Sequence, residues 1–150
     1  MLEDKFYHQL LKCFNQQKRW INQQTNQIDV LPGQSKFLLC LKEYGPLSPL
    51  TPKEIGKLCI VDKSTTTSLL NKMEKMNYIE KKTQNQDKRS IQIHLTKRGY
   101  EKALQVEKIS NESEQLFLST LSKEDQVKII QLLKQINLFM EGELNNGNTK

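Results

Sequence analysis

The chain has 150 residues, of which 36% are hydrophobic and 27% charged, and its net charge is +6. This length and balance fit one soluble globular domain, with or without extensions. No stretch approaches the roughly 18 consecutive apolar residues that a membrane span requires. The N-terminus, MLEDKFYHQL, lacks the apolar core of a secretory signal. The sequence therefore predicts a cytoplasmic protein with no membrane partner.

The residue types that carry enzymatic or metal chemistry are sparse. Three cysteines at irregular spacing, Cys13, Cys40 and Cys59, do not form a disulfide framework. Two histidines are too few for an ordinary closed zinc site. The sequence has no phosphate-binding glycine loop, HExxH motif or nucleophile elbow. We therefore expect no metal, no cofactor and no enzymatic activity.

The positive charge is concentrated in the middle of the chain. Residues 51–100 carry 11 basic and 5 acidic side chains, whereas residues 1–50 carry 6 and 4, and residues 101–150 carry 6 and 8. A basic segment between neutral or acidic ones is typical of a nucleic-acid-binding module. A solvated, lysine-rich surface is the alternative, and charge alone does not choose between the two.

Two helices and a short strand are predicted before the basic segment. Residues 3–27 predict a long helix, because apolar side chains recur there at helical spacing. Pro32-Gly33 ends it and begins a second helix, which stops at Gly45-Pro46. Residues 47–50 could then form a short strand.

Capping signatures mark the next two helices. Residues 51–54, Thr-Pro-Lys-Glu, combine a capping threonine, a proline suited to the first helical position and a glutamate that can reach back. In this short third helix we expect Ile55 and Leu58 to point inward. After a turn, Asp62 can cap a fourth helix that extends to about Met76.

A hairpin and two further helices complete the pattern. Residues 78–82 and 90–95 have strand character, the second through strict alternation of apolar and polar side chains. Thr96 and Ser122 each can cap a following helix. The last helix carries an apolar stripe of Ile129, Leu133, Ile136 and Met140.

A short helix, a turn, a longer helix and a hairpin follow in the order of a winged helix-turn-helix, whose second helix enters the major groove. The fourth helix begins with a hydroxyl-rich run of poor helix propensity. Hydroxyl groups can donate to phosphates and contact base edges, which favours DNA contact; simple capping of the helix start is the alternative. From this helix the predicted DNA contacts are Lys63, Ser64, Thr65, Thr66, Thr67, Ser68, Asn71 and Lys72.

The loop between the two strands is the predicted wing tip. Arg89, with Lys88 beside it, can enter a narrow and electronegative minor groove. Asp87 is well placed to hold the arginine or the hairpin in one geometry. The alternative is a surface ion pair that contributes roughly 0–1 kcal/mol to stability.

These motifs together resemble the MarR family of winged helix-turn-helix regulators. Residues 87–99, DKRSIQIHLTKRG, resemble the family's wing signature of Asp-x-Arg followed by Leu-Thr and Gly. Residues 50–56 resemble the opening of its short helix, and residues 69–79 the close of its recognition helix. Two positions depart from the pattern. Ser68 stands where the family often has arginine, and Asn77 stands in place of the usual glycine, although asparagine can also adopt the left-handed conformation.

The resemblance implies a mainly α (α+β) fold, a winged helix-turn-helix with N- and C-terminal dimerisation helices. The expected organisation is a dimerisation helix in residues 1–30, the DNA-binding domain in 31–100, dimerisation helices in 101–145 and a flexible tail in 146–150. It further implies a homodimeric repressor that binds a pseudo-palindromic site on double-stranded DNA and is released by a small-molecule effector or an oxidant. In the family's wing, the arginine and its partner aspartate correspond to Arg89 and Asp87.

Two points stay open at the level of sequence. Cys13 lies in the first helix, where one branch of the family keeps a peroxide-reactive cysteine, but cysteines on helix faces are more often inert packing residues. The main functional alternative is a winged helix that serves as a protein-interaction adaptor without sequence-specific DNA binding.

Overall fold

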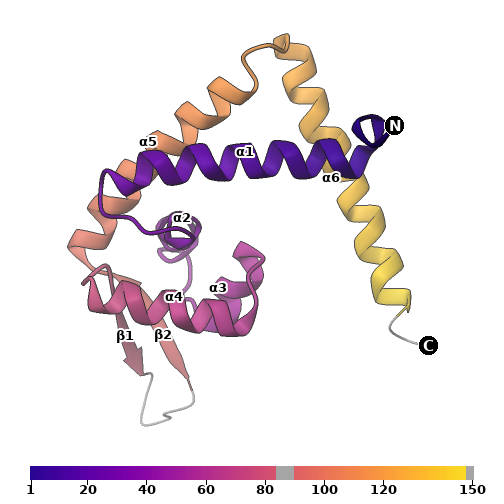
Figure 1. The fold of residues 1–150 in the computed structure, drawn as a ribbon. Coiled ribbons are helices and arrows are strands. Elements are labelled where there is room, and N and C mark those ends of the chain that lie inside the picture. Colours follow the sequence, from indigo (N-terminus) through magenta and orange to yellow (C-terminus); the bar gives the residue numbers. More distant parts are fainter. Residues whose placement is uncertain (84–89, 148–150) are drawn as a thin grey trace. The chain divides into compact units, whose positions relative to one another are not determined.

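The structure is a computed structural model that describes residues 1–83 and 90–147 (Figure 1). The chain divides into two compact units, Met1–Ser113 and Glu114–Lys150. Helix α5, Lys97–Phe117, contains the boundary between them. The described part is mainly helical, with one two-stranded sheet, as the sequence predicts.

The first unit opens with a short 3-10 turn, η1 (Leu2–Asp4), and two helices, α1 (Phe6–Asn26) and α2 (Gln34–Tyr44). Gly33 begins α2 with a φ of +88°, a conformation that glycine adopts without steric cost. The predicted helix over 3–27 is thus interrupted only at Lys5. The predicted strand at 47–50 is reduced to one bridge, in which the Ile93 amide donates to the Leu50 carbonyl at 2.8 Å.

Helices α3 (Pro52–Cys59) and α4 (Lys63–Lys75) begin at the predicted caps. Thr51 and Glu54 form a reciprocal capping box, and Asp62 accepts the Thr65 amide at 2.8 Å. Ile55 is fully buried, but Leu58 is 47% exposed, so the prediction that Leu58 points inward is wrong. In so short a helix, the inward face is occupied instead by Ile55, Gly56 and Cys59.

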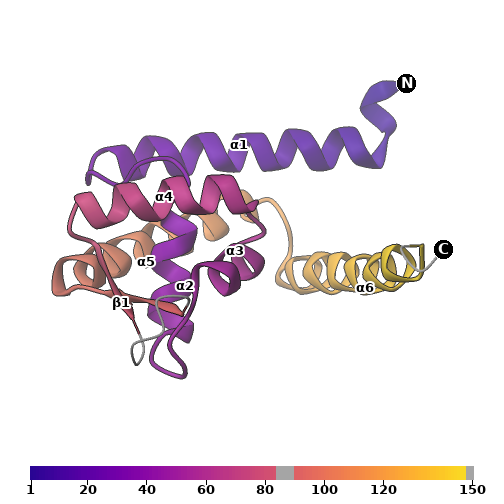
Figure 2. The same cartoon turned by 90° about the horizontal axis from the view of Figure 1, so that it is seen from below.

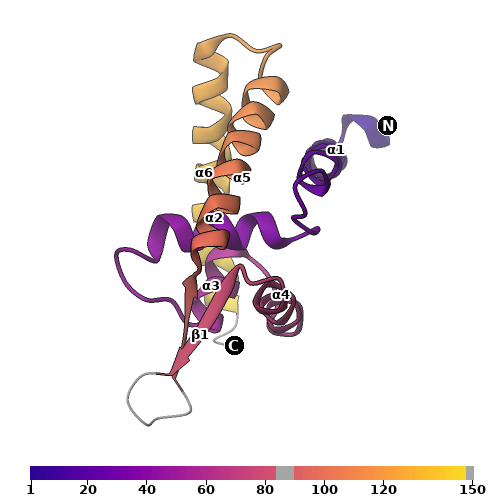
Figure 3. The same cartoon turned by 90° about the vertical axis from the view of Figure 1, so that its left-hand side faces the viewer.

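Strands β1 (Ile79–Thr83) and β2 (Ile91–Leu95) pair antiparallel, with Ile79 opposite Leu95. Figure 3 shows this hairpin beside α4, which is seen nearly end-on. Asn77, just before β1, has a φ of +60°, so it adopts the left-handed conformation expected of it. The following residue, Tyr78, is fully buried, and its hydroxyl donates to the Asp29 carbonyl at 2.6 Å.

The hydrophobic core of the first unit lies between α2, α3, α4, the hairpin and the start of α5. Its fully buried side chains interlock helices with the sheet, as close packing requires. The largest of them are Phe37, Leu38, Ile55, Leu70, Met73, Tyr78, Ile79 and Ile93.

Helix α6 (Lys123–Gly147) belongs to the second unit and begins at Ser122, whose hydroxyl accepts the Asp125 amide at 3.1 Å. This helix buries none of its residues. Large apolar side chains are exposed along it, among them Val127, Leu132, Leu138, Phe139 and Leu144.

Among the described residues, no helix is both long and apolar enough to cross a membrane.

The turn between α3 and α4 contains a conformational strain that a substitution can test. Ile60 has a φ of +60° and is 91% exposed, so an unfavourable backbone conformation is not offset by burial. The left-handed conformation costs roughly 1–2 kcal/mol for a residue with a Cβ. We expect Ile60→Gly to raise the free energy of unfolding by about 1 kcal/mol in urea denaturation. Ile60→Ala is the matched control, since it shortens the side chain but keeps the Cβ; equal stabilities of the two variants would contradict the strain.

Candidate nucleic-acid interface

Helix α4 presents two opposite faces. Thr66, Leu70 and Met73 are buried and pack on the core. The opposite face carries exposed side chains at spacings of three and four residues, which place them in one row along the helix. This outward row consists of Ser64, Ser68, Asn71 and Lys75.

Thr66 does not belong to the exposed surface, contrary to its inclusion among the predicted DNA contacts. Its side chain is only 3% exposed, and its hydroxyl lies 3.5 Å from the Val61 carbonyl. A Cβ built on Gly56 would lie 2.8 Å from the Thr66 hydroxyl oxygen, so α3 and α4 approach closely here. Thr66 is therefore a packing residue between the two helices, and we remove it from the proposed set of DNA contacts.

The other hydroxyl groups at the start of α4 are exposed, and two of them also bond within the helix. The Thr65 hydroxyl donates to the Asp62 carboxylate at 2.8 Å, and the Thr67 hydroxyl donates to the Lys63 carbonyl at 3.0 Å. The capping interpretation thus describes Thr65 in this structure. Ser64, Ser68 and Lys72 are exposed and available to a partner.

The wing borders α4 on one side. A depression of about 740 Å³ lies between the starts of α3 and α4 and the base of β2. Its lining combines apolar residues with hydroxyl groups and two lysines, and lysines at such a position can contact a phosphate. The lining polar side chains are Thr51, Lys53, Lys63, Thr66, Thr67 and Ser90. The predicted wing-tip residues Asp87, Lys88 and Arg89 lie outside the described residues.

Lys81 in β1 links the wing to α4, a contact that was not predicted from the sequence. Its ammonium donates to the side-chain oxygen of Asn71 at 2.7 Å and lies 3.8 Å from the Glu74 carboxylate. The alternation of side chains along a strand could have indicated this contact, because Lys81 shares a face of β1 with the buried Ile79. A lysine on that face must extend beside α4 rather than away from it.

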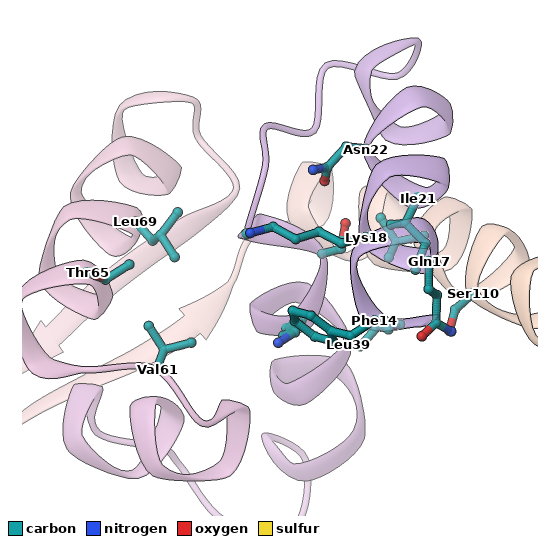
Figure 4. A pocket seen from close by; sticks show the side chains of 14 residues that line it. Phe14, Gln17, Lys18, Ile21, Asn22, Leu39, Val61, Thr65, Leu69 and Ser110 are labelled. Atoms are coloured by element: carbon teal, nitrogen blue, oxygen red, sulfur yellow. The ribbon is translucent and has the colours of Figure 1, made fainter. Parts of the chain in front are cut away.

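A second cavity, of about 320 Å³, separates α4 from α1 (Figure 4). Val61, Thr65 and Leu69 line it from the side of α4, and Phe14 and Ile21 line it from α1. Figures 1 and 2 show these two helices running roughly parallel. Figure 4 shows Lys18 reaching from α1 into the space between them.

The charged side chains that line this cavity are positive. Lys18 and Lys36 are among its lining residues, and none of the described residues that line it is an aspartate or a glutamate. The Lys36 ammonium lies 5.8 Å from the centre of the Phe14 ring. An apolar cavity of this size with two cations at its edge suits a small, mostly apolar molecule that carries a negative charge.

The three cysteines are free and differ in exposure. Cys13 is exposed on α1. Cys40 and Cys59 are buried, as expected, and burial raises the pKa of both thiols, that of Cys59 to about 12. Within the described part of the chain, no three or more His, Cys, Asp or Glu side chains are grouped to hold a metal ion.

The fold defines a winged helix-turn-helix protein, and solved structures share it. A Staphylococcus aureus MepR–DNA complex matches with a TM-score of 0.81 and 23% identity, over 92% of this chain and 98% of that one. Wild-type MarR of E. coli, without ligand, matches with a TM-score of 0.69 and 20% identity, over 88% and 96%.

Sequence comparison finds similarity to a family of regulators. The model of the MarR family matches residues 32–91. The transcriptional regulator SarZ of Staphylococcus epidermidis is 36% identical over 77 residues, which are 43% of this chain and 52% of SarZ. PecS of Dickeya dadantii is 27% identical over 100 residues, 67% of this chain and 60% of PecS. The chain thus spans between half and two thirds of these relatives. Its residues 32–91 match the MarR family, the family that its wing and helix motifs resemble.

The cap of α4 gives a pH-dependent prediction. The Thr65 amide and then the Thr65 hydroxyl donate to the Asp62 carboxylate and lower its pKa. A lowered pKa stabilises the fold at pH values above the carboxyl's unfolded pKa, and this stability is lost as the pH falls through the folded one. We expect Asp62→Ala to lower Tm at pH 7 and the difference from wild type to shrink below about pH 4.

Asp62→Asn is the matched control for this prediction, because an amide oxygen can still accept the Thr65 amide but does not titrate. Thermal melting followed by circular dichroism measures both variants. A difference between wild type and Asp62→Ala that stays constant from pH 7 to pH 3 would contradict the role of the carboxylate.

Proposed function

We propose that this protein is a transcriptional regulator that binds duplex DNA with α4 in the major groove. The proposal rests mainly on the outward row of polar side chains on α4. This row does not pack on the core, and lysines lie on either side of it. A major groove admits one helix, and short hydroxyl and amide side chains bring its axis close to the base edges. The similarity to SarZ and PecS, which are both transcriptional regulators, supports this function.

Phosphate contacts and the wing would complete the interface. Lys53, Lys63 and Lys72 are exposed at the edges of α3 and α4, where a lysine can neutralise a phosphate without reading sequence. We further propose that Lys88 and Arg89 reach the adjacent minor groove, with Asp87 supporting the arginine. The proposed base-edge contacts are Ser64, Thr67, Ser68 and Asn71, whereas Thr65 caps the helix through Asp62.

A homodimer is the second part of the proposal. The exposed apolar side chains of α6, together with Phe6, Tyr7 and Leu10 on α1, exceed what a monomer normally leaves in water. A second copy of the chain would cover them and would present two copies of α4 to a pseudo-palindromic site. The domain boundaries expected from the sequence, with dimerisation helices on either side of residues 31–100, fit this arrangement.

Regulation is the third part. We propose that the protein acts as a repressor in the cytoplasm and leaves DNA when a small molecule occupies the cavity between α1 and α4. Because Thr65 and Leu69 line that cavity from the recognition helix itself, an occupant would bear directly on the orientation of α4. Oxidation of the exposed Cys13 is the other candidate signal.

DNA binding is tested by selection on random duplexes, followed by gel shift at several salt concentrations. We expect one enriched site and an affinity that falls steeply with salt, because several phosphates are neutralised. Lys72→Ala should lower the slope of log affinity against log salt by about one. Lys108→Ala is the matched control, since it removes an equal charge from an exposed position on α5 and should leave the slope unchanged.

The same gel shift identifies the class of signal. Release by a phenolic carboxylate, but not by hydrogen peroxide, would favour the cavity, whereas release by peroxide that Cys13→Ser abolishes would favour oxidation. Failure of the wild-type protein to bind any duplex, specific or mixed, would overturn the proposed function and favour an adaptor.

Dimerisation is tested by sedimentation at micromolar concentration. We expect a species of twice the 17.5 kDa chain mass. Ile136→Glu should shift it toward the monomer, because an unpaired charge would lie in the apolar stripe of α6. The matched control Gln135→Glu adds the same charge beside the stripe and should leave the dimer intact. A wild-type protein that sediments only as a monomer would contradict this part of the proposal.

A further inference from the structure

The contact between Lys81 and Asn71 fixes the orientation of a side chain in the outward row of α4. Asn71 is exposed, and the Lys81 ammonium lies 2.7 Å from its side-chain oxygen. The Lys81 side chain is only 26% exposed and also faces Glu74 at 3.8 Å. The wing strand thus delivers a positive charge to one specific atom of the recognition helix.

The chemistry of lysine determines which end of the amide is turned toward the wing. An ammonium group has three donors and no acceptor, so the Asn71 atom that faces it must be the carbonyl oxygen. The amide nitrogen and its two hydrogens therefore point away from Lys81. On the outward row of α4, those hydrogens are available to donate.

This orientation selects among the bases. An asparagine that pairs with adenine in two places must accept from the adenine amino group and donate to N7. Here the accepting oxygen is engaged by a cation, which disfavours an approaching amino group. The pair instead presents donors from both Asn71 and Lys81, and guanine offers two acceptors, O6 and N7, in the major groove.

We propose that Asn71, held by Lys81, reads a guanine in each half-site. Asn71 is the reading residue, and Lys81 acts as a positioning residue that also supplies positive charge beside the base. The inference rests on the proposed function, because it requires α4 to lie in the major groove. It adds to that function the identity of one base in the binding site and the chemical reason why that base is recognised.

The test is selection on random duplexes with wild type, Lys81→Met and Asn71→Ala, each checked for folding by its melting temperature. Methionine keeps an unbranched, flexible stem but cannot donate. We expect a guanine at one position of the wild-type site. The preference for guanine there should fall about tenfold or more in both variants, within the range of a two-point base contact.

Lys82→Met is the matched control, because Lys82 is the adjacent strand lysine, is exposed and pairs with Glu80 at 3.3 Å rather than with α4. It should weaken binding to all sites alike and keep the guanine preference. Lys81→Arg, which retains the donor, should also keep it. These two variants separate loss of charge from loss of orientation.

The outcomes distinguish this inference from the function on which it rests. A wild-type site whose base preferences are unchanged in Lys81→Met would overturn the role of Lys81 and leave the regulator intact. An adenine at the position that Asn71→Ala relaxes would overturn the guanine assignment. Absence of any selected site for the wild type would overturn both proposals.

Discussion

The arrangement of the interface depends on the burial of Tyr78. Its hydroxyl holds the loop after α1 through Asp29, and its main chain packs so closely on α5 that a Cβ on Gly99 would overlap the Tyr78 carbonyl oxygen. That carbonyl also accepts the Thr96 amide at 3.1 Å. One residue therefore fixes the start of the wing against both α5 and the segment that follows α1.

Helix α4 has three distinct environments around its circumference. Its inner face is part of the core, its outward row is exposed and meets the wing at Asn71, and one flank lines the cavity through Leu69. Base reading and response to a ligand would thus be served by closely spaced positions of a single helix, such as Asn71 and Leu69.

The helix starts could be predicted from the sequence because capping is local. Thr51, Asp62 and Ser122 each bond an amide three residues away, so the signal and the structure lie in the same few residues. The left-handed Asn77 was predictable for the same reason, and the family resemblance supplied the order of the elements.

The features that could not be predicted from the sequence depend on contacts between distant segments. Leu58 and Thr66 were misplaced because the rotation of α3 and α4 about their axes is set by their mutual packing at Gly56. The cavity and the link from Lys81 to Asn71 likewise join elements that are separate in the chain. Hydroxyl groups in a row suggest a surface, but only packing decides which of them reach it.

The unequal burial of the three thiols has a practical consequence. Maleimides react with thiolates, and near neutral pH a thiol with a pKa of about 12, such as Cys59, is almost never ionised. Cys40 is shielded in the same way, whereas Cys13 is open to solvent on α1. The unaltered chain can therefore carry a single fluorophore at Cys13, on a helix that also lines the cavity, without any engineered cysteine.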